Sequence, residues 1–192
     1  LAQETVTEDT TGSDFAEWFY AETDGLTLDG AGGDDILESA GDHASIIGGA
    51  GDDRIDVTGV DTVIDSGAGD DQVTALGGTF SLGAGDDSGR FSGGEILAHG
   101  GAGDDTISAY DTDDALIYGE SGDDNLNVSG SGAVARGGGG LVRGCDEDDD
   151  NDNDDDDDDD RGRHRAGRQS GTVFFAARCA GLLHAPEQLP QR

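Results

Sequence analysis

The sequence predicts an all-β protein, a parallel β-solenoid with about 18 residues per coil, followed by a disordered carboxyl-terminal tail. Three observations predict it. A Gly/Asp-rich nonapeptide occurs six times between residues 29 and 127, its copies are spaced by about twice nine residues, and apolar residues alternate on both sides of each copy. A step of this length returns the chain to the same side of a coil, and glycine permits the tight turn that each return needs.

The spacing of the six nonapeptides indicates the length of each coil. They read DGAGGDDIL (29–37), GGAGDDRID (48–56), SGAGDDQVT (66–74), LGAGDDSGR (82–90), GGAGDDTIS (100–108) and GESGDDNLN (119–127). Their central glycines are Gly32, Gly51, Gly69, Gly85, Gly103 and Gly122, which gives successive steps of 19, 18, 16, 18 and 19. The fourth copy is the weakest, because Gly89 stands where an aliphatic residue is expected and the step before it is short. We expect the solenoid to be right-handed.

Two short strands are expected in each coil, one on either side of the glycine loop. Apolar residues at period two follow the aspartate pairs, and a second set precedes the glycine loops. Such alternation is typical of half-buried strands, so each coil is expected to contain a strand, a glycine loop, a strand and a plainer return loop. The predicted core positions are Ile55, Val57, Val73, Ala75, Ile107, Ala109, Leu126 and Val128 after the pairs, and Ile46, Ile64, Phe80, Ile96, Ala98 and Ile117 before the loops.

Residues 1–28 are the least repetitive part of the front half, and we expect an amino-terminal cap that contains a degenerate first repeat. Gly12 and Asp14 fall where the fourth and sixth motif positions would be. An aromatic cluster follows, made of Phe15, Trp18, Phe19 and Tyr20. Repeat architectures need their exposed ends covered, which favours a capping role for this cluster over an aromatic ligand platform.

The repeat body is expected to span residues 29–140, and the tail residues 141–192. Four glycines arrive at 137–140, where the next copy is due, but Leu141 and Val142 stand in place of the aspartates. An aspartate run and an aperiodic arginine-rich end follow. This abrupt change favours a disordered tail, and it suggests a shifted reading frame or a recombined end. The chain starts at Leu1 and contains no methionine, which suggests a fragment of a longer product.

Charge and missing motifs narrow the function. The net charge of −34 over 192 residues predicts that nucleic acids and anionic lipids are repelled by the surface, apart from the basic tail. No segment approaches the roughly 20 apolar residues of a membrane helix, so we expect no membrane insertion. Neither an HExxH helix nor a GxSxG elbow occurs, so we expect no enzyme activity in this chain.

The nonapeptide resembles the GGxGxDxUx repeat of RTX proteins, in which U is a large apolar residue. GGAGDDRID (48–56) and GGAGDDTIS (100–108) match at every defined position, and the other four copies carry one or two substitutions. The resemblance covers roughly residues 9–140. It implies a parallel β-roll in which the first six residues of each copy form a turn that binds Ca²⁺ through loop carbonyls and the sixth-position carboxylate.

The resemblance also implies a set of metal-binding residues. Oxygen-only ligands suit Ca²⁺ better than zinc or copper, and Mg²⁺ demands a compact octahedron that stacked loops do not readily supply. The implied sixth-position ligands are Asp34, Asp53, Asp71, Asp87, Asp105 and Asp124, with Asp14 a weaker candidate. The implied loop glycines are Gly30, Gly32, Gly49, Gly51, Gly67, Gly69, Gly83, Gly85, Gly101, Gly103 and Gly122.

One departure from the fullest RTX arrays bears on the number of ions. The alternate nonapeptides, such as VTGVDTVID (57–65), lack the motif, so one row of about five shared calcium ions is expected rather than two rows. For the fifth-position aspartates we expect solvent exposure, with an outer-shell or hydrogen-bonding role as the alternative; these are Asp52, Asp70, Asp86, Asp104 and Asp123.

Membership of this family would imply calcium-dependent folding of a secreted bacterial protein exported by type I secretion machinery, and hence an extracellular or cell-surface location. Stacked carboxylates repel one another without calcium, and metal binding energy becomes folding energy. Two alternatives remain open: a stalk segment of a calcium-stiffened surface adhesin, and an accessory module of a secreted enzyme whose catalytic domain lies outside this chain. A third is a degraded gene fragment without function.

Overall fold

The computed structural model of the protein describes residues 1–144 and 175–176. This part of the chain contains strands and turns and no helix, so no helix is present that could cross a membrane. The strands are β1 (Glu4–Val6), β2 (Thr10–Thr11), β3 (Trp18–Ala21), β4 (Thr27–Asp29), β5 (Ile36–Ser39), β6 (Ser45–Ala50), β7 (Arg54–Val57), β8 (Thr62–Ala68), β9 (Gln72–Ala84), β10 (Ser88–Ala102), β11 (Thr106–Asp113), β12 (Leu116–Ser121), β13 (Asp123–Ser131), β14 (Val134–Arg136), β15 (Gly139–Gly144) and β16 (Phe175–Ala176).

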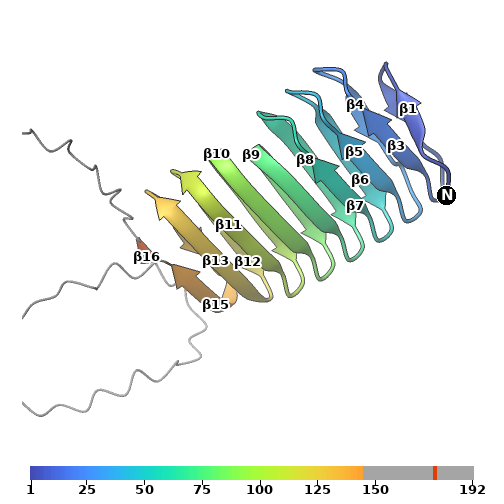
Figure 1. Cartoon of the computed structure of the whole chain (residues 1–192). Coiled ribbons are helices and arrows are strands. Elements are labelled where there is room, and N and C mark those ends of the chain that lie inside the picture. The colour runs from blue at the N-terminus through green and yellow to red at the C-terminus, as the bar shows by residue number, and fades with distance from the viewer. Residues whose placement is uncertain (145–174, 177–192) are drawn as a thin grey trace, which may run out of the picture.

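The strands stack as a parallel β-solenoid of about eight turns with about 18 residues per coil, which confirms the predicted fold class (Figure 1). Face A contains the strands that follow the aspartate pairs, in the order β1-β3-β5-β7-β9-β10-β11-β13-β15. Face B contains β2, β4, β6, β8, the second halves of β9 and β10, β12 and β14. Each residue of a strand pairs with its equivalent in the next coil, as Leu37 pairs with Ile55 on face A.

The core is a narrow ladder of apolar side chains between the two faces. The strands alternate inward and outward residues, as the burial of Ile55 and Val57 in β7 illustrates. Every core position predicted from the sequence is buried, with a relative exposure of 4% or less. Each coil contributes only a few inward-facing side chains, so the core between the two faces consists of a single layer of side chains from each face.

The fourth repeat differs from the others in its core and in its return turn. The step that leads to its glycine loop, from Gly69 to Gly85, is the shortest in the array. The chain passes through Gly77 and Gly78 so directly that β9 runs unbroken between the faces. A Cβ added to Gly89 would lie 2.8 Å from the Phe91 ring, which therefore occupies the volume of the missing aliphatic residue. Phe91 stacks on Phe80 with ring centroids 4.4 Å apart.

Both ends of the solenoid extend beyond the expected repeat body. Residues 1–29 contribute β1–β4 in the same parallel register as the coils that follow. The aromatic residues of this segment have different environments. Phe19 is buried in the core, Trp18 and Tyr20 lie on the outer surface of face A, and Phe15 is 77% exposed.

The expectation of disorder from residue 141 onward is wrong for residues 141–144. They belong to β15, which pairs in parallel with β13, and Val142 packs against the core. The expectation that Leu141 and Val142 replace the two aspartates is also wrong, because Gly139 and Gly140 pair with Asp123 and Asp124, and Val142 pairs with the buried Leu126. Phe175–Ala176 forms β16, antiparallel to β14. The remaining expectations for the tail concern residues 145–174 and 177–192, which lie outside the described part of the chain.

Candidate metal centre

The glycine loops are tight turns stacked along one long edge of the solenoid. The second and fourth motif positions have positive φ, for example 113° at Gly49 and 129° at Gly51, a region that favours glycine. The first copy, counted from Gly30, has Ala31 at the second position, and the last copy has Glu120 there. The φ angle is 69° at both residues. Each turn bonds to the next through its backbone, as when Gly51 N–H donates to the Ala68 carbonyl at 2.8 Å. This stacking fixes the aspartate pair of each coil directly above the pair of the next.

The second aspartate of each pair belongs to an inner row that is almost completely buried. One carboxylate oxygen, Oδ1, accepts the backbone N–H of the equivalent aspartate in the preceding coil, at 2.8–3.1 Å. Neighbouring strands lie about 4.8 Å apart, so the carboxylates form a line at that spacing. The inner row consists of Asp35, Asp53, Asp71, Asp87, Asp105 and Asp124, with exposures of 0–2%.

The other carboxylate oxygen of every inner-row residue, Oδ2, is buried without a hydrogen-bond partner. A buried and unpaired carboxylate is costly because it loses its hydration and gains nothing in return. Burial accordingly raises the pKa of Asp53 and of Asp87 to about 7, and that of Asp35 and of Asp105 to about 6. The pKa values of Asp71 and Asp124 are raised for the same reason.

Glycine at the first motif position leaves room for these oxygens. A Cβ added to Gly48 would lie 2.5 Å from Asp53 Oδ2, and one added to Gly119 would lie 2.2 Å from Asp124 Oδ2. The third and fourth copies place Ser66 and Leu82 at this position, and both side chains are buried. Ser66 Oγ donates to the Leu82 carbonyl at 2.6 Å, so the loop environment is not identical in every coil.

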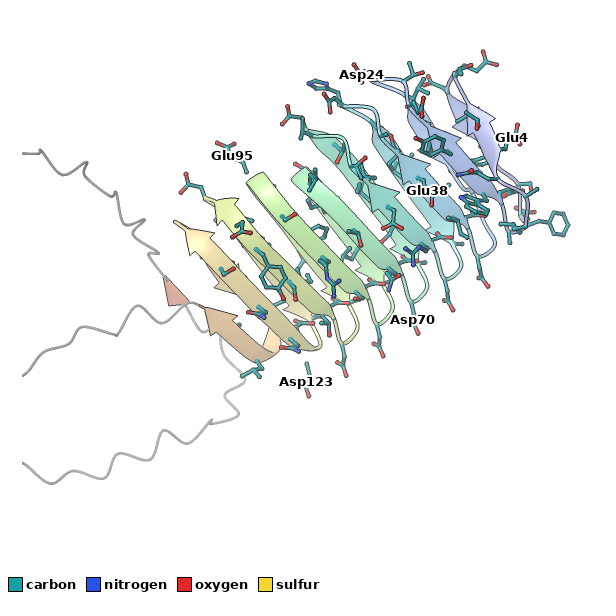
Figure 2. The ribbon with its side chains drawn as sticks, in the orientation of Figure 1. Glu4, Asp24, Glu38, Asp70, Glu95 and Asp123 are labelled. Atoms are coloured by element: carbon teal, nitrogen blue, oxygen red, sulfur yellow. The ribbon has the colours of Figure 1, made fainter. Side chains whose placement is uncertain are left out.

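The first aspartate of each pair belongs to an exposed outer row. Its Oδ1 accepts the backbone N–H of the equivalent aspartate in the following coil, at 2.7–3.0 Å, so the two ladders point in opposite directions along the solenoid. Figure 2 shows two members, Asp70 and Asp123, projecting from the edge formed by the glycine loops. The outer row consists of Asp34, Asp52, Asp70, Asp86, Asp104 and Asp123. All six are exposed, as was predicted for every member except Asp34, and they also form the hydrogen bonds that the alternative interpretation required.

In the first copy, the structure assigns the inner position to Asp35 and not to Asp34. Ile36 pairs with Arg54, which aligns Asp35 with Asp53, and Asp35 N–H donates to Asp53 Oδ1. The position expected from the sequence is wrong by one residue here, because the motif in this copy starts at Gly30 and not at Asp29. Gly33, and not Gly32, is therefore the counterpart of Gly51, and Gly30 stands at the first position.

The degenerate first repeat places Glu17 in line with the inner row. Glu17 N–H donates to Asp35 Oδ1 at 2.7 Å, and its carboxylate accepts the hydroxyl of Ser13. Asp14, the weaker candidate from the sequence, is exposed and lies beside Gly32 of the next coil. The signal that could have identified Glu17 is its position, two residues before the buried Phe19, since Asp35 likewise stands two residues before Leu37.

The donor set fits a hard cation that takes part of its coordination from the backbone. Within residues 1–144 and 175–176, no group of three or more His, Cys, Asp or Glu side chains is arranged to hold a metal ion. An ion at the inner row would therefore need loop carbonyls in addition to the Oδ2 atoms. Oxygen-only coordination of this mixed kind is what Ca²⁺ takes.

The fold and the two aspartate rows define a parallel β-solenoid repeat protein. Comparison with protein-family models, with curated proteins and with solved structures found no match for the chain.

Proposed function

We propose that the inner row binds calcium and that calcium binding drives folding of the solenoid. The observation that supports this proposal is the line of six buried Oδ2 atoms without hydrogen-bond partners. A divalent cation shared between successive loops would give these oxygens a partner and would reduce the repulsion between neighbouring carboxylates. The six loops have five gaps between them, so about five ions are expected in one row.

The residues assigned to this role are the six inner-row aspartates, with the glycine loops supplying carbonyl oxygens. Ca²⁺ supplies charge neutralisation and flexible oxygen coordination, and it is favoured over Mg²⁺ because Mg²⁺ requires near-ideal octahedral geometry. The outer-row aspartates hold adjacent coils together through their hydrogen bonds and raise the negative potential at the edge. Glu17 is a candidate ligand at the amino-terminal end of the row.

Export follows as a further part of the proposal. A chain with a net charge of −34 and a thin core gains little from folding without a cation, because its carboxylates repel one another. Extracellular calcium modules bind at about 10⁻⁴–10⁻³ M, well above cytosolic calcium. The chain would therefore remain unfolded inside a bacterial cell, would suit type I secretion, and would fold outside it.

The same chemistry supports two alternative roles. A calcium-stiffened solenoid would also serve as a stalk of a surface adhesin, or as an accessory module beside a catalytic domain. Both alternatives need the inner row to bind calcium, and they differ in the segments to which the solenoid is joined.

A calcium titration of the full chain tests the proposal. Far-UV circular dichroism in chelator is expected to show mostly coil, and Ca²⁺ is expected to produce a cooperative transition to β structure. Mg²⁺ at equal ionic strength serves as the control and is expected to produce little change. Complete β structure in chelator at neutral pH, or an equal response to Mg²⁺, would contradict calcium-driven folding.

A further inference from the structure

The long edge opposite the calcium-binding loops borders a surface groove that the proposed function does not use. This groove, with a volume of about 510 Å³, lies on the outer surface of face B across β8, β9, β10 and β12. Its floor is a row of four side chains that the strand register places side by side: Val63, Thr79, Leu97 and Leu116. Val63 is 54% exposed and Leu116 39% exposed, so apolar area faces solvent here.

The shortened fourth coil helps to form the groove. The return turn at Gly77–Gly78 is two residues shorter than an 18-residue coil would require, whereas the neighbouring turns contain Asp61 and Glu95. The groove therefore spans a shortened return turn and its longer neighbours. Its position follows from the same 16-residue step that weakens the fourth repeat.

Acidic side chains line one long side of the groove. Asp61, Glu95 and Asp114 stand in the return turns of three coils and all line the groove. Figure 2 shows Glu95 on the edge of the solenoid opposite Asp70 and Asp123. An apolar floor beside a row of carboxylates is complementary to a surface that presents apolar and basic side chains in two parallel lines.

The backbone of the groove restricts what can bind there. β8, β9, β10 and β12 each pair with a strand on both sides, so no free strand edge is available to an added β-strand. A partner must therefore bind through side chains. An α-helix lying along the solenoid axis presents one side-chain position per turn of about 5.4 Å, close to the strand spacing of about 4.8 Å.

We propose that this groove is a docking site for a basic amphipathic helix of about three to four turns from a partner protein. The apolar face of the helix lies on Val63, Leu97 and Leu116, and its Lys or Arg side chains pair with Asp61, Glu95 and Asp114. A second copy of this chain is disfavoured as the occupant because two chains of charge −34 repel each other. The outer surface of face A offers no equivalent, since its central strands present polar residues such as Thr74, Ser108 and Asn127.

The test uses the full chain in saturating calcium and a fluorescein-labelled helical peptide of about 14 residues, with Leu on one face and Lys beside it. Saturable binding in fluorescence anisotropy is expected. A scrambled peptide of the same composition and a peptide with Glu in place of Lys are expected to bind at least about tenfold more weakly. Equal binding of the scrambled peptide would reduce the interaction to general attraction between opposite charges and would overturn the proposal.

Two sets of variants locate the site. The charge set, Asp61→Asn with Glu95→Gln and Asp114→Asn, is expected to weaken binding about tenfold, and Asn suits the positive φ of Asp61 and Asp114. The matched control carries the same change in net charge on the first coils, at Glu4→Gln, Glu8→Gln and Glu22→Gln, and is expected to change binding less than about twofold. Equal loss in both sets would contradict the groove as the site.

The apolar set gives an independent readout. Val63→Ser with Leu116→Ser is expected to weaken binding by about tenfold or more, whereas Phe15→Ser with Ile47→Ser removes two exposed apolar side chains elsewhere and is expected to have little effect. The calcium midpoint of folding, measured in parallel, should stay unchanged in all four variants. An unchanged midpoint shows that calcium-dependent folding is intact, so a failure of peptide binding then counts against the docking proposal alone. The docking proposal does not itself require calcium to bind at the inner row.

Other occupants give distinct results in the same assays. Concentration-dependent dimerisation in sedimentation that Val63→Ser with Leu116→Ser abolishes would assign the groove to a second copy. Tighter peptide binding after replacement of the arginines in residues 161–168 by Gln would assign it to the chain's own arginine-rich segment. Either result would overturn the proposal of a separate basic helix.

Discussion

At the scale of single residues, the two aspartates of each motif are adjacent in sequence and have different environments. Asp53 is 1% exposed, with one oxygen bonded to a backbone N–H and the other without a partner. Asp52 is exposed, and its Oδ1 accepts the N–H of Asp70. Period-two alternation explains the difference, because consecutive residues in extended chain point to opposite sides. One residue is therefore available for an internal ion, and its neighbour for solvent and for the bond to the next coil.

Asp53→Asn and Asp52→Asn form a matched pair of substitutions. Asp53→Asn removes an unpaired buried charge, so we expect the metal-free chain to gain β structure at neutral pH, while the calcium midpoint of folding rises several-fold. Asp52→Asn keeps an oxygen acceptor at an exposed position and should shift the midpoint less than about twofold. Circular dichroism during calcium titration measures both effects. Equal shifts in the two variants would mean that the inner row has no special role.

Gly48→Ala tests the space in front of the inner row. The added Cβ would lie 2.5 Å from Asp53 Oδ2 and 2.3 Å from the Ser66 carbonyl oxygen, so both must move. We expect a loss of about 1–3 kcal/mol in the free energy of unfolding in calcium, together with weaker calcium binding. Gly25→Asn is the control, because no atom lies within 4 Å of a Cβ there and Asn tolerates its φ of 72°. An unaffected Gly48→Ala variant would refute the close approach.

At the scale of the coil, the fourth repeat shows how an altered motif remains compatible with the stack. Gly89 pairs with Val73 and Ile107, and both of these neighbours are buried. The missing side-chain volume is filled by the ring of Phe91 and by Leu82, whose Cδ1 would lie 3.2 Å from a Cβ on Gly89. Strand position is therefore maintained, although the side chains that fill the core come from different motif positions.

A double-mutant cycle between Gly89 and Phe91 tests this compensation. Gly89→Ala alone should destabilise the chain because its Cβ meets the Phe91 ring, and Phe91→Leu alone should cost about 1–3 kcal/mol through lost packing. The double variant should be more stable than the sum of the two single effects predicts, by at least about 0.5 kcal/mol, since the added Ala methyl occupies volume that the Phe ring leaves when it is replaced by Leu. Denaturant unfolding in calcium provides the measurement. Phe91→Leu with Val6→Ala, in the first coil, should be additive, and additivity in the Gly89 pair would disprove the compensation.

At the scale of the whole molecule, the inner row links folding to pH as well as to calcium. In the metal-free fold, burial raises the pKa of four aspartates from an ordinary value of 3.8 to about 6 or 7. The folded chain therefore binds more protons than the unfolded chain between pH about 4 and 7, and stability must fall as pH rises through this window. Protonation and calcium are thus alternative ways to neutralise the same row.

This linkage predicts a pH-dependent transition in chelator. We expect β structure to increase when the pH is lowered from about 7.5 to about 5, and to decrease reversibly when the pH is raised again. In saturating calcium the dependence should be weaker over the same range, because the carboxylates are held by the metal. The Asp53→Asn variant in chelator should show a smaller pH response than the unsubstituted chain. A metal-free chain that becomes more stable as pH rises from 5 to 7.5 would contradict buried, unpaired carboxylates.

Much of the fold follows from local sequence. The period-two apolar residues identified the core positions, such as Ile55 and Ile107, because alternation fixes which face of a strand is buried. The spacing of the motifs determined the coil length, because each motif requires the same tight glycine turn. The buried aspartates of the second to sixth copies are the same residues that the sequence places at the sixth motif position.

The remaining features depend on contacts between coils, which the sequence of one coil does not specify. Asp35 takes the place expected for Asp34, and Glu17 joins the row, because backbone pairing between neighbouring strands sets the register. Val142 extends the core because it pairs with Leu126 of β13, whereas Gly139 and Gly140 pair with Asp123 and Asp124. The sequence by itself therefore determined the coil, its inward residues and its glycine turns. Only the tertiary structure decided which acidic residues face inward at the amino-terminal end of the array, how coil four is filled and where the face B groove lies, because these features depend on hydrogen bonding and packing between residues of different coils.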